Sequence, residues 1–329
     1  MKKTTLFTLF LMFTGILSAQ APARQLDKQN MREGESIEYC HTHKKMVELL
    51  KDPAMLAIYE QEQQNELLNK GKDVAPKATV YKIPVVFHVL HNGGVENISD
   101  EQIRDCIRVM NEDFLKQNAD TVDVVQEFQG EIGFTNIEFR LALKDPSGNP
   151  TNGINRYFQP SLTNNGGENS KINQWDRSKY LNIWVVKTMN SGAAAYTYRP
   201  STVNSNSFKS GDGIISLHDY VGSIGTGSYG RSRTLTHEVG HWINLAHTWG
   251  NGNEPGEVGN CNIDDGVFDT PNTMGNTSCN LGTNSCSSVD SYYGKNQISI
   301  LIPTLKKIYF FLNIIIGQQK KCMQILNLF

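Results

Sequence analysis

The sequence lacks an excess of either charge, and it lacks an apolar run long enough to cross a membrane. Its formal net charge is −2 over 329 residues, so charge gives no reason to expect a nucleic acid or an anionic membrane as a partner. The apolar runs near its ends, residues 6–17 and 308–316, are shorter than the ~20 residues that a membrane-spanning helix needs. We expect no nucleic-acid partner, no stable membrane association and a monomeric state.

The N-terminus has the order of a secretory signal peptide. Lys2 and Lys3 precede the apolar run, and the small residues Ser18 and Ala19 follow it. This order predicts cleavage after Ala19 and an exported protein. The alternative is a membrane anchor, which the short run disfavours.

Residues 20–77 are polar and charged, with a helical pattern over residues 46–59 that is broken at Pro53 and followed by a linker-type stretch. From Tyr81 the pattern becomes that of an α/β domain, in which strands and helices alternate over a mixed sheet. Ser99 and Gln102 form a predicted capping box that starts a helix. The predicted strands are Ile83–Leu90, Ile137–Leu143, Tyr180–Val186 and Gly213–Leu217, with a short edge strand within Ser191–Tyr198.

The stretch TLTHEVGHWINLAHTWG holds three of the eight histidines. His237 and His241 are four residues apart, which places both imidazoles on one face of a helix. Glu238 lies beside the first ligand and is placed to act on a water bound to the ion. Asn244 tolerates a left-handed conformation, so a turn there could bring His247 back as a third ligand. The alternative is an amphipathic helix with unrelated histidines.

Three neutral imidazoles and a water make an open, catalytic type of zinc site. Zinc lowers the pKa of its water toward about 7 and polarises the scissile carbonyl. Glu238 is expected to take the proton during attack and to pass it to the leaving amine. The pattern therefore predicts Zn²⁺-dependent hydrolysis that releases an amine, as in the cleavage of protein or peptide substrates.

These residues resemble the metzincin clan of metallopeptidases, and within it the pappalysin family of bacterial secreted enzymes. The resemblance extends to YKIPVVFHVLHN, NISDEQI, DPSGNPTNGI, WDRSKYLNIWVV and CNIDDGVFDTPNT, and it covers roughly residues 36–290. It implies a metzincin-like α/β catalytic domain with a mixed twisted sheet, a backing helix and an active-site helix. The implied organisation is a signal peptide (1–19), a pro-segment with linker (20–77), a catalytic domain (78–290) and an aberrant tail (291–329).

The resemblance also assigns roles to individual residues. His237, His241 and His247 would bind zinc, and Glu238 would be the general base. Cys40 would hold zinc as a thiolate in a latent zymogen; the alternative is a free or disulfide-bonded cysteine. Activation would then need cleavage of the linker near residues 70–77.

Two further features of the cysteine-rich segment follow from the family pattern. It implies a Ca²⁺ site, for which the candidate ligands are Asp264, Asp265 and Asp269, because carboxylate and carbonyl oxygens suit a hard cation. The alternative there is an ordinary Asp-rich loop. It also pairs Cys261 with Cys286, and it leaves Cys279 without its later partner.

The tail departs from the family. Metzincins carry a methionine-containing turn beneath the zinc, and here Met274 lies too early and Met323 too late for that turn. No Asp or Glu follows Asp290. We interpret this as a frameshift or truncation after about residue 290 that leaves the C-terminal subdomain incomplete; an authentic divergent C-terminus is the alternative.

Three functional hypotheses result. The first is a secreted zinc endopeptidase made as a zymogen. The second is a catalytically inactive zinc-binding remnant. The third, a zinc hydrolase that does not act on peptides, is weaker because the spacing of His247 fits peptidases so well.

Overall fold

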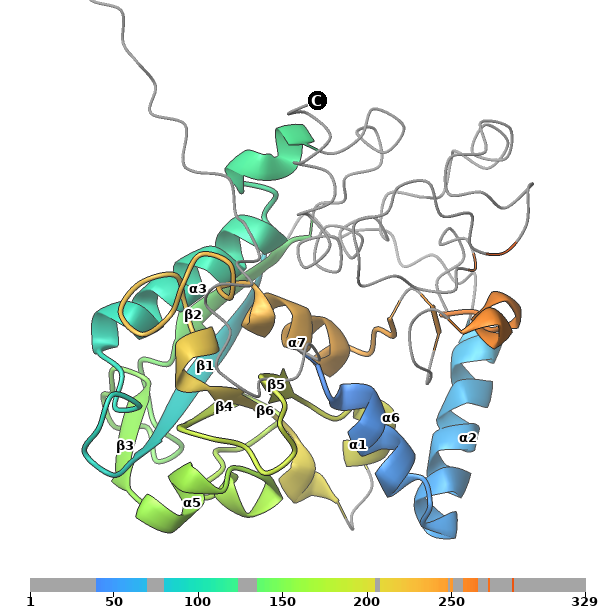
Figure 1. Cartoon of the computed structure of the whole chain (residues 1–329), viewed down its shortest axis with the longest axis horizontal. Coiled ribbons are helices and arrows are strands. Elements are labelled where there is room, and N and C mark those ends of the chain that lie inside the picture. The colour runs from blue at the N-terminus through green and yellow to red at the C-terminus, as the bar shows by residue number, and fades with distance from the viewer. Residues whose placement is uncertain are drawn as a thin grey trace, which may run out of the picture.

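The computed structural model contains a six-stranded sheet with helices packed on it and two N-terminal helices beside it (Figure 1). The structure describes residues 40–69, 80–123, 135–204, 208–247, 249–250, 257–265, 272 and 286. The predicted signal peptide and the tail after residue 290 lie outside these residues. No helix within the described part is long and apolar enough to span a membrane.

The sheet is mixed, as predicted. Its strand order is β2-β1-β4-β6-β5, and β3 also pairs with β1. All pairings are parallel except that of β5 with β6. The strands are β1 (Tyr81–His91), β2 (Ile137–Leu141), β3 (Ile154–Phe158), β4 (Leu181–Val186), β5 (Ala195–Tyr196) and β6 (Ile214–Leu217).

The apolar run of β1 places this strand inside the sheet, because a strand that is apolar at successive positions must be buried on both faces. Its N-terminal half pairs with β2 from Tyr81 to Val85, and its C-terminal half pairs with β3 from Phe87 to His91. On the other edge, Val85–Val89 pair with β4.

The helices follow the order of the sequence patterns. The α-helices are α1 (Thr42–Leu49), α2 (Pro53–Asn69), α3 (Asp100–Phe114), α5 (Pro160–Asn164), α6 (Pro200–Val203) and α7 (Thr234–Trp242). The short 3-10 helices are η2 (Ala119–Asp123), η3 (Glu168–Ser170), η4 (Lys209–Gly211), η5 (His218–Tyr220) and η6 (Val258–Asn262). The predicted break at Pro53 is present between α1 and α2; it spans residues 50–52, and Pro53 is the first residue of α2.

Each face of the sheet has its own apolar core. On one face, side chains of β1 and β4 pack with α3 and with Leu235 and Val239 of α7. On the other face, Trp184, Ile215 and Tyr196 pack with Met46 of α1. Burying a large aliphatic side chain contributes roughly 1.5–3 kcal/mol. The two buried residues of α7 therefore hold that helix against the sheet.

The N-terminal segment, residues 40–69, lies along the edge of the sheet. Cys40 makes an isolated parallel bridge with Ala195 of β5, and the His41 amide donates to the Ala195 carbonyl at 3.3 Å. In Figure 1, α1 lies beside α6 and near one end of α7, with α2 further out. The segment thus reaches the neighbourhood of the histidine-bearing helix.

Two predictions differ from the structure. β3 is absent from the predicted strands, because INRYF is only five residues long, directly follows a turn sequence and is held by its pairing with β1. The capping box forms only in part. The Ser99 hydroxyl accepts from the Gln102 amide at 3.2 Å, but the Gln102 side chain donates to the carbonyls of His218 and Val221 instead of returning to the cap.

Candidate metal centre

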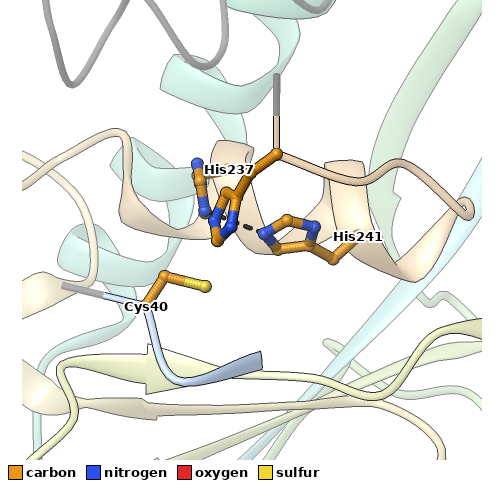
Figure 2. Close-up of side chains that lie close together, drawn as sticks. Cys40, His237 and His241 are labelled. Atoms are coloured by element: carbon orange, nitrogen blue, oxygen red, sulfur yellow. Dashed lines mark hydrogen bonds between the residues drawn. The ribbon is translucent and has the colours of Figure 1, made fainter. Parts of the chain in front are cut away.

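The helix α7 places two histidines side by side. Leu235 and Val239 turn toward the core, so His237 and His241 share another face of the helix. Figure 2 shows the two rings close together, with the Cys40 thiol pointing toward them from the N-terminal segment. The Nε2 atoms of the two histidines are 3.0 Å apart, and both residues are 3% exposed.

A left-handed residue ends this helix, as predicted. Asn244 has a φ of 83°, a conformation that costs a non-glycine residue roughly 1–2 kcal/mol. The Asn244 amide donates to the His241 carbonyl at 2.9 Å, and the Leu245 amide donates to the Gly240 carbonyl at 3.0 Å. These bonds satisfy carbonyls at the helix end while the chain reverses.

The reversal brings His247 to the other two histidines. Its ring centroid lies 4.7 Å from that of His241 and 5.4 Å from that of His237. The Trp249 ring stacks on His247 at 4.5 Å with an interplanar angle of 16°. The Trp249 ring thus packs against one face of the His247 ring, and the turn at Asn244 sets the position of the His247 backbone.

The protonation states of these imidazoles suit metal binding. Burial lowers the pKa of His237 and His247 well below the usual range and lowers the pKa of His241 to about 4. Nδ1 of His241 faces the Leu245 carbonyl at 2.6 Å and must donate to it, because a carbonyl only accepts. Nε2 of His241 therefore keeps its lone pair.

Cys40 completes the cluster. One ring nitrogen from each histidine and the Cys40 Sγ all lie within 4.8 Å of one another. Neutral imidazole and thiolate are ligands that zinc prefers in tetrahedral sets, where two nitrogens on one ion are about 3.3 Å apart. The residues present therefore fit a zinc ion. Burial, and then the Glu238 carboxylate, raises the pKa of the Cys40 thiol in the absence of a metal.

Glu238 is buried beside this cluster and contacts the N-terminal segment. The Thr42 hydroxyl donates to its Oε2 at 2.9 Å, and the same hydroxyl accepts from the Thr197 amide at 3.1 Å. Burial raises the pKa of Glu238 to about 8, while hydrogen bonds from Thr42 and Cys40 partly oppose this rise. The raised pKa thus belongs to the arrangement in which the N-terminal segment covers the carboxyl group.

The predicted calcium site lies only partly within the described residues. Asp264 and Asp265 follow η6, and Asp269 is outside the described part. Among the described residues, the cluster of Cys40 and the three histidines is the one group of three or more candidate metal ligands. Calcium binding therefore stays a prediction. Cys261 and Cys286 are disulfide-bonded, with their Cα atoms 5.2 Å apart.

The sequence analysis missed three residues that surround the cluster: Thr42, Arg199 and Trp249. Trp249 lies two residues after His247, so its proximity could have been expected. Thr42 is close to Cys40 in sequence but 196 residues from its partner Glu238. Arg199 is 45 residues from its partner Asn244, and no local pattern marks it.

Comparison with known proteins gives consistent results for family and fold. The peptidase family model described as pregnancy-associated plasma protein-A matches residues 165–301. An extracellular metalloprotease of Arthroderma gypseum is 30% identical over 209 residues, which cover 62% of this chain. The chain spans 60% of the length of that relative.

Two solved structures from Tannerella forsythia are also similar. A promirolysin mutant has a TM-score of 0.65 and 27% identity, over 87% of this chain and 96% of that one. Mature mirolysin in complex with a cleaved peptide has a TM-score of 0.58 and 30% identity, over 77% of this chain and 98% of that one.

Proposed function

The chain belongs to the pappalysin family of metallopeptidases, and from this premise we propose that it is an exported zinc endopeptidase made in a latent form. The observation that carries the proposal is the convergence of His237, His241, His247 and Cys40 within 4.8 Å. Three histidines would hold zinc in the active enzyme, and Cys40 would be the fourth ligand in the latent one. The extracellular relative and the sequence of the N-terminus support export.

The proposed chemistry assigns proton transfer to Glu238. When bound, zinc makes a water acidic enough to be a nucleophile near neutral pH and polarises a carbonyl. Glu238 takes the proton of the attacking water on a carboxylate oxygen and then delivers it to the nitrogen of the leaving amine. Its position directly after His237 on α7 supports this role, because it places the carboxylate beside a water bound at the histidines.

Latency is proposed to depend on two contacts of the N-terminal segment. The Cys40 thiolate would take the ligand position that catalysis needs, and Thr42 occupies the carboxylate of Glu238. The similarity to promirolysin over most of both chains supports a latent form. Cleavage near residues 70–77, a range outside the described residues, would release the segment.

The remaining assignments also stay within this proposal. The Asp264, Asp265 and Asp269 carboxylates are proposed to hold calcium. The bond between Cys261 and Cys286 would stabilise the segment that follows the third histidine, as disulfides commonly do in exported proteins.

The test uses the full chain loaded with zinc. Brief trypsin treatment would cut after lysines such as Lys70, Lys72 and Lys77, and a serine-protease inhibitor would then stop the trypsin. We expect cleavage of a denatured protein substrate that a chelator abolishes. Glu238→Ala should lower turnover by about 100- to 10,000-fold or more while the bound zinc per chain is unchanged.

The outcomes separate the hypotheses. Cleavage that persists in the chelator, or that survives Glu238→Ala, would overturn the proposed chemistry. One bound zinc without any cleavage would favour the inactive zinc-binding remnant. Zinc loss in Glu238→Ala would show that this carboxylate is a ligand and not the base.

A further inference from the structure

The position of His247 depends on a turn at Asn244, and the sequence of that turn alone does not stabilise it. The helix α7 ends at Trp242, and the chain must reverse before His247 can reach the other two histidines. The reversal passes through Asn244 in the left-handed region, at a φ of 83°. Asn tolerates this conformation better than most residues but, unlike glycine, does not favour it.

Arg199 makes two hydrogen bonds to Asn244. Its Nε donates to the Asn244 side-chain Oδ1 at 3.2 Å, and its Nη2 donates to the Asn244 backbone carbonyl at 3.0 Å. The guanidinium is planar and presents its donors in a fixed fork, so contacts to both oxygens restrict the orientation of the Asn244 residue. Arg199 is 6% exposed, and the surroundings therefore leave it little freedom.

The position of Arg199 in the chain makes it a link between two parts of the site. It lies between β5 and α6, in the segment that follows the strand bridged by Cys40. Together with His241 and His247 it lines a cavity of about 120 Å³ beneath the N-terminal segment. The hydrogen bonds of the guanidinium thus connect the segment after edge strand β5 to the turn that precedes His247.

Charge alone would make Arg199 unfavourable at this position. A cation beside two candidate ligands repels a divalent metal ion. The carbonyl end of α7 offsets part of this repulsion, since cations are favoured at helix C-termini. Any contribution of Arg199 to the metal centre must therefore come from geometry and not from attraction of the ion.

We propose that Arg199 is a positioning residue that holds His247 at the metal centre by fixing the turn at Asn244. This inference rests on the proposed zinc site. Residues that orient metal ligands from outside typically change metal affinity by about 10- to 100-fold when removed. Arg199→Met should therefore weaken zinc binding by about 10- to 100-fold.

The experiment measures zinc affinity by competition with a chromophoric chelator in the full chain carrying Cys40→Ser, so that only the histidines bind. The absorption spectrum of the Co²⁺ form reports the ligand geometry independently of activity. Arg199→Lys keeps the charge but loses the fork, and it should also weaken binding. Arg156→Met is the matched control, because Arg156 pairs with Asp100 at the start of α3 and is not among the residues that line the cavity beside the histidines.

A second substitution tests the proposed route. Asn244→Gly removes the backbone strain, so adding it to Arg199→Met should restore most of the lost affinity and the parent Co²⁺ spectrum. A general loss of folding would not be rescued in this way. If Arg199→Met does not fold, Asn244→Ala supplies the same test, because it loses the side-chain acceptor and the tolerance for a left-handed φ.

Equal zinc affinity of the parent and a folded Arg199→Met would overturn the inference. So would equal weakening by Arg156→Met, or affinity that Asn244→Gly does not restore. A parent chain that binds no zinc would instead contradict the proposed function.

Discussion

Thr42 connects the N-terminal segment to the candidate base through a single hydroxyl. It donates to Glu238 and accepts from the Thr197 amide, so its hydroxyl connects the N-terminal segment to α7 and to the residue after β5. Both partners are far from Thr42 in the sequence. Burial raises the pKa of Glu238 to about 8, so near neutral pH this is mostly a hydrogen bond between uncharged groups, which contributes about 0.5–1.5 kcal/mol.

Thr42→Val keeps the shape of the side chain and removes this hydrogen bond. We expect the uncut chain to show about tenfold higher basal proteolytic activity. The N-terminal segment would bind less tightly, while the zinc ligands are unchanged. The measurement compares the activity of uncut chains before and after a chelator is added.

Lys51→Ala is the control for Thr42→Val, since Lys51 is exposed on the same segment. It should leave basal activity unaltered. If Thr42→Val also leaves the basal activity of the uncut chain unchanged, the Thr42 hydroxyl has no part in latency. The Cys40 thiolate alone would then have to account for it.

At the scale of an element, the start of α3 shows how a long-range contact can replace an interaction that the local sequence predicts. The sequence SDEQ satisfies the pattern of a capping box, but Gln102 is buried and lies across the loop at residues 218–226. Its side chain donates to two backbone carbonyls and accepts from the Thr226 amide. The partners are about as far away in sequence as those of a strand pairing, so no local pattern could reveal them.

Two substitutions separate the cap from the loop contact. Ser99→Ala removes the cap and should cost about 1 kcal/mol of unfolding free energy. Gln102→Ala removes the hydrogen bonds of the Val221 carbonyl and the Thr226 amide, while the His218 carbonyl keeps the Thr226 hydroxyl, so it should cost more, about 2–4 kcal/mol. Chemical denaturation of both variants checks this order. Equal costs would mean that water replaces the Gln102 contacts.

The elements predicted best are those whose signal is local. The apolar run of β1 and the spacing of His237, His241 and Asn244 indicated a buried strand, a histidine-bearing helix and a left-handed exit. β3 could not be found in this way, because its five residues give too short a pattern and the strand is stabilised by pairing with Phe87–His91 of β1. For the site, residue types and spacing suffice for the histidines but not for Arg199, whose partner is brought near only by the fold.

At the scale of the whole molecule, the candidate zinc site joins three parts of the fold. Cys40 belongs to the N-terminal segment, two histidines belong to α7, and His247 follows the turn. An ion bound by all three would therefore stabilise the native arrangement as a unit. A ligand present at 1,000 times its dissociation constant adds about 4 kcal/mol to the free energy of unfolding.

We expect zinc to raise the thermal midpoint of the full chain by roughly 10 °C over the chelated protein. His237→Ala should abolish this shift because it removes a ligand. His91→Ala, a substitution at the end of β1, should retain it. A similar rise in His237→Ala would place the stabilising ion elsewhere in the chain.

The N-terminal segment and the centre it covers belong to one polypeptide, joined through residues 70–79. A short covalent tether gives a bound group an effective concentration of the order of millimolar, whatever the concentration of the protein. The proposed inhibition within the intact chain would therefore be insensitive to dilution. Once the tether is cut, the same contacts become those of a two-body complex, which dissociates as it is diluted. If the chain is exported and cleaved as proposed, dilution outside the cell would then dissociate the cut segment.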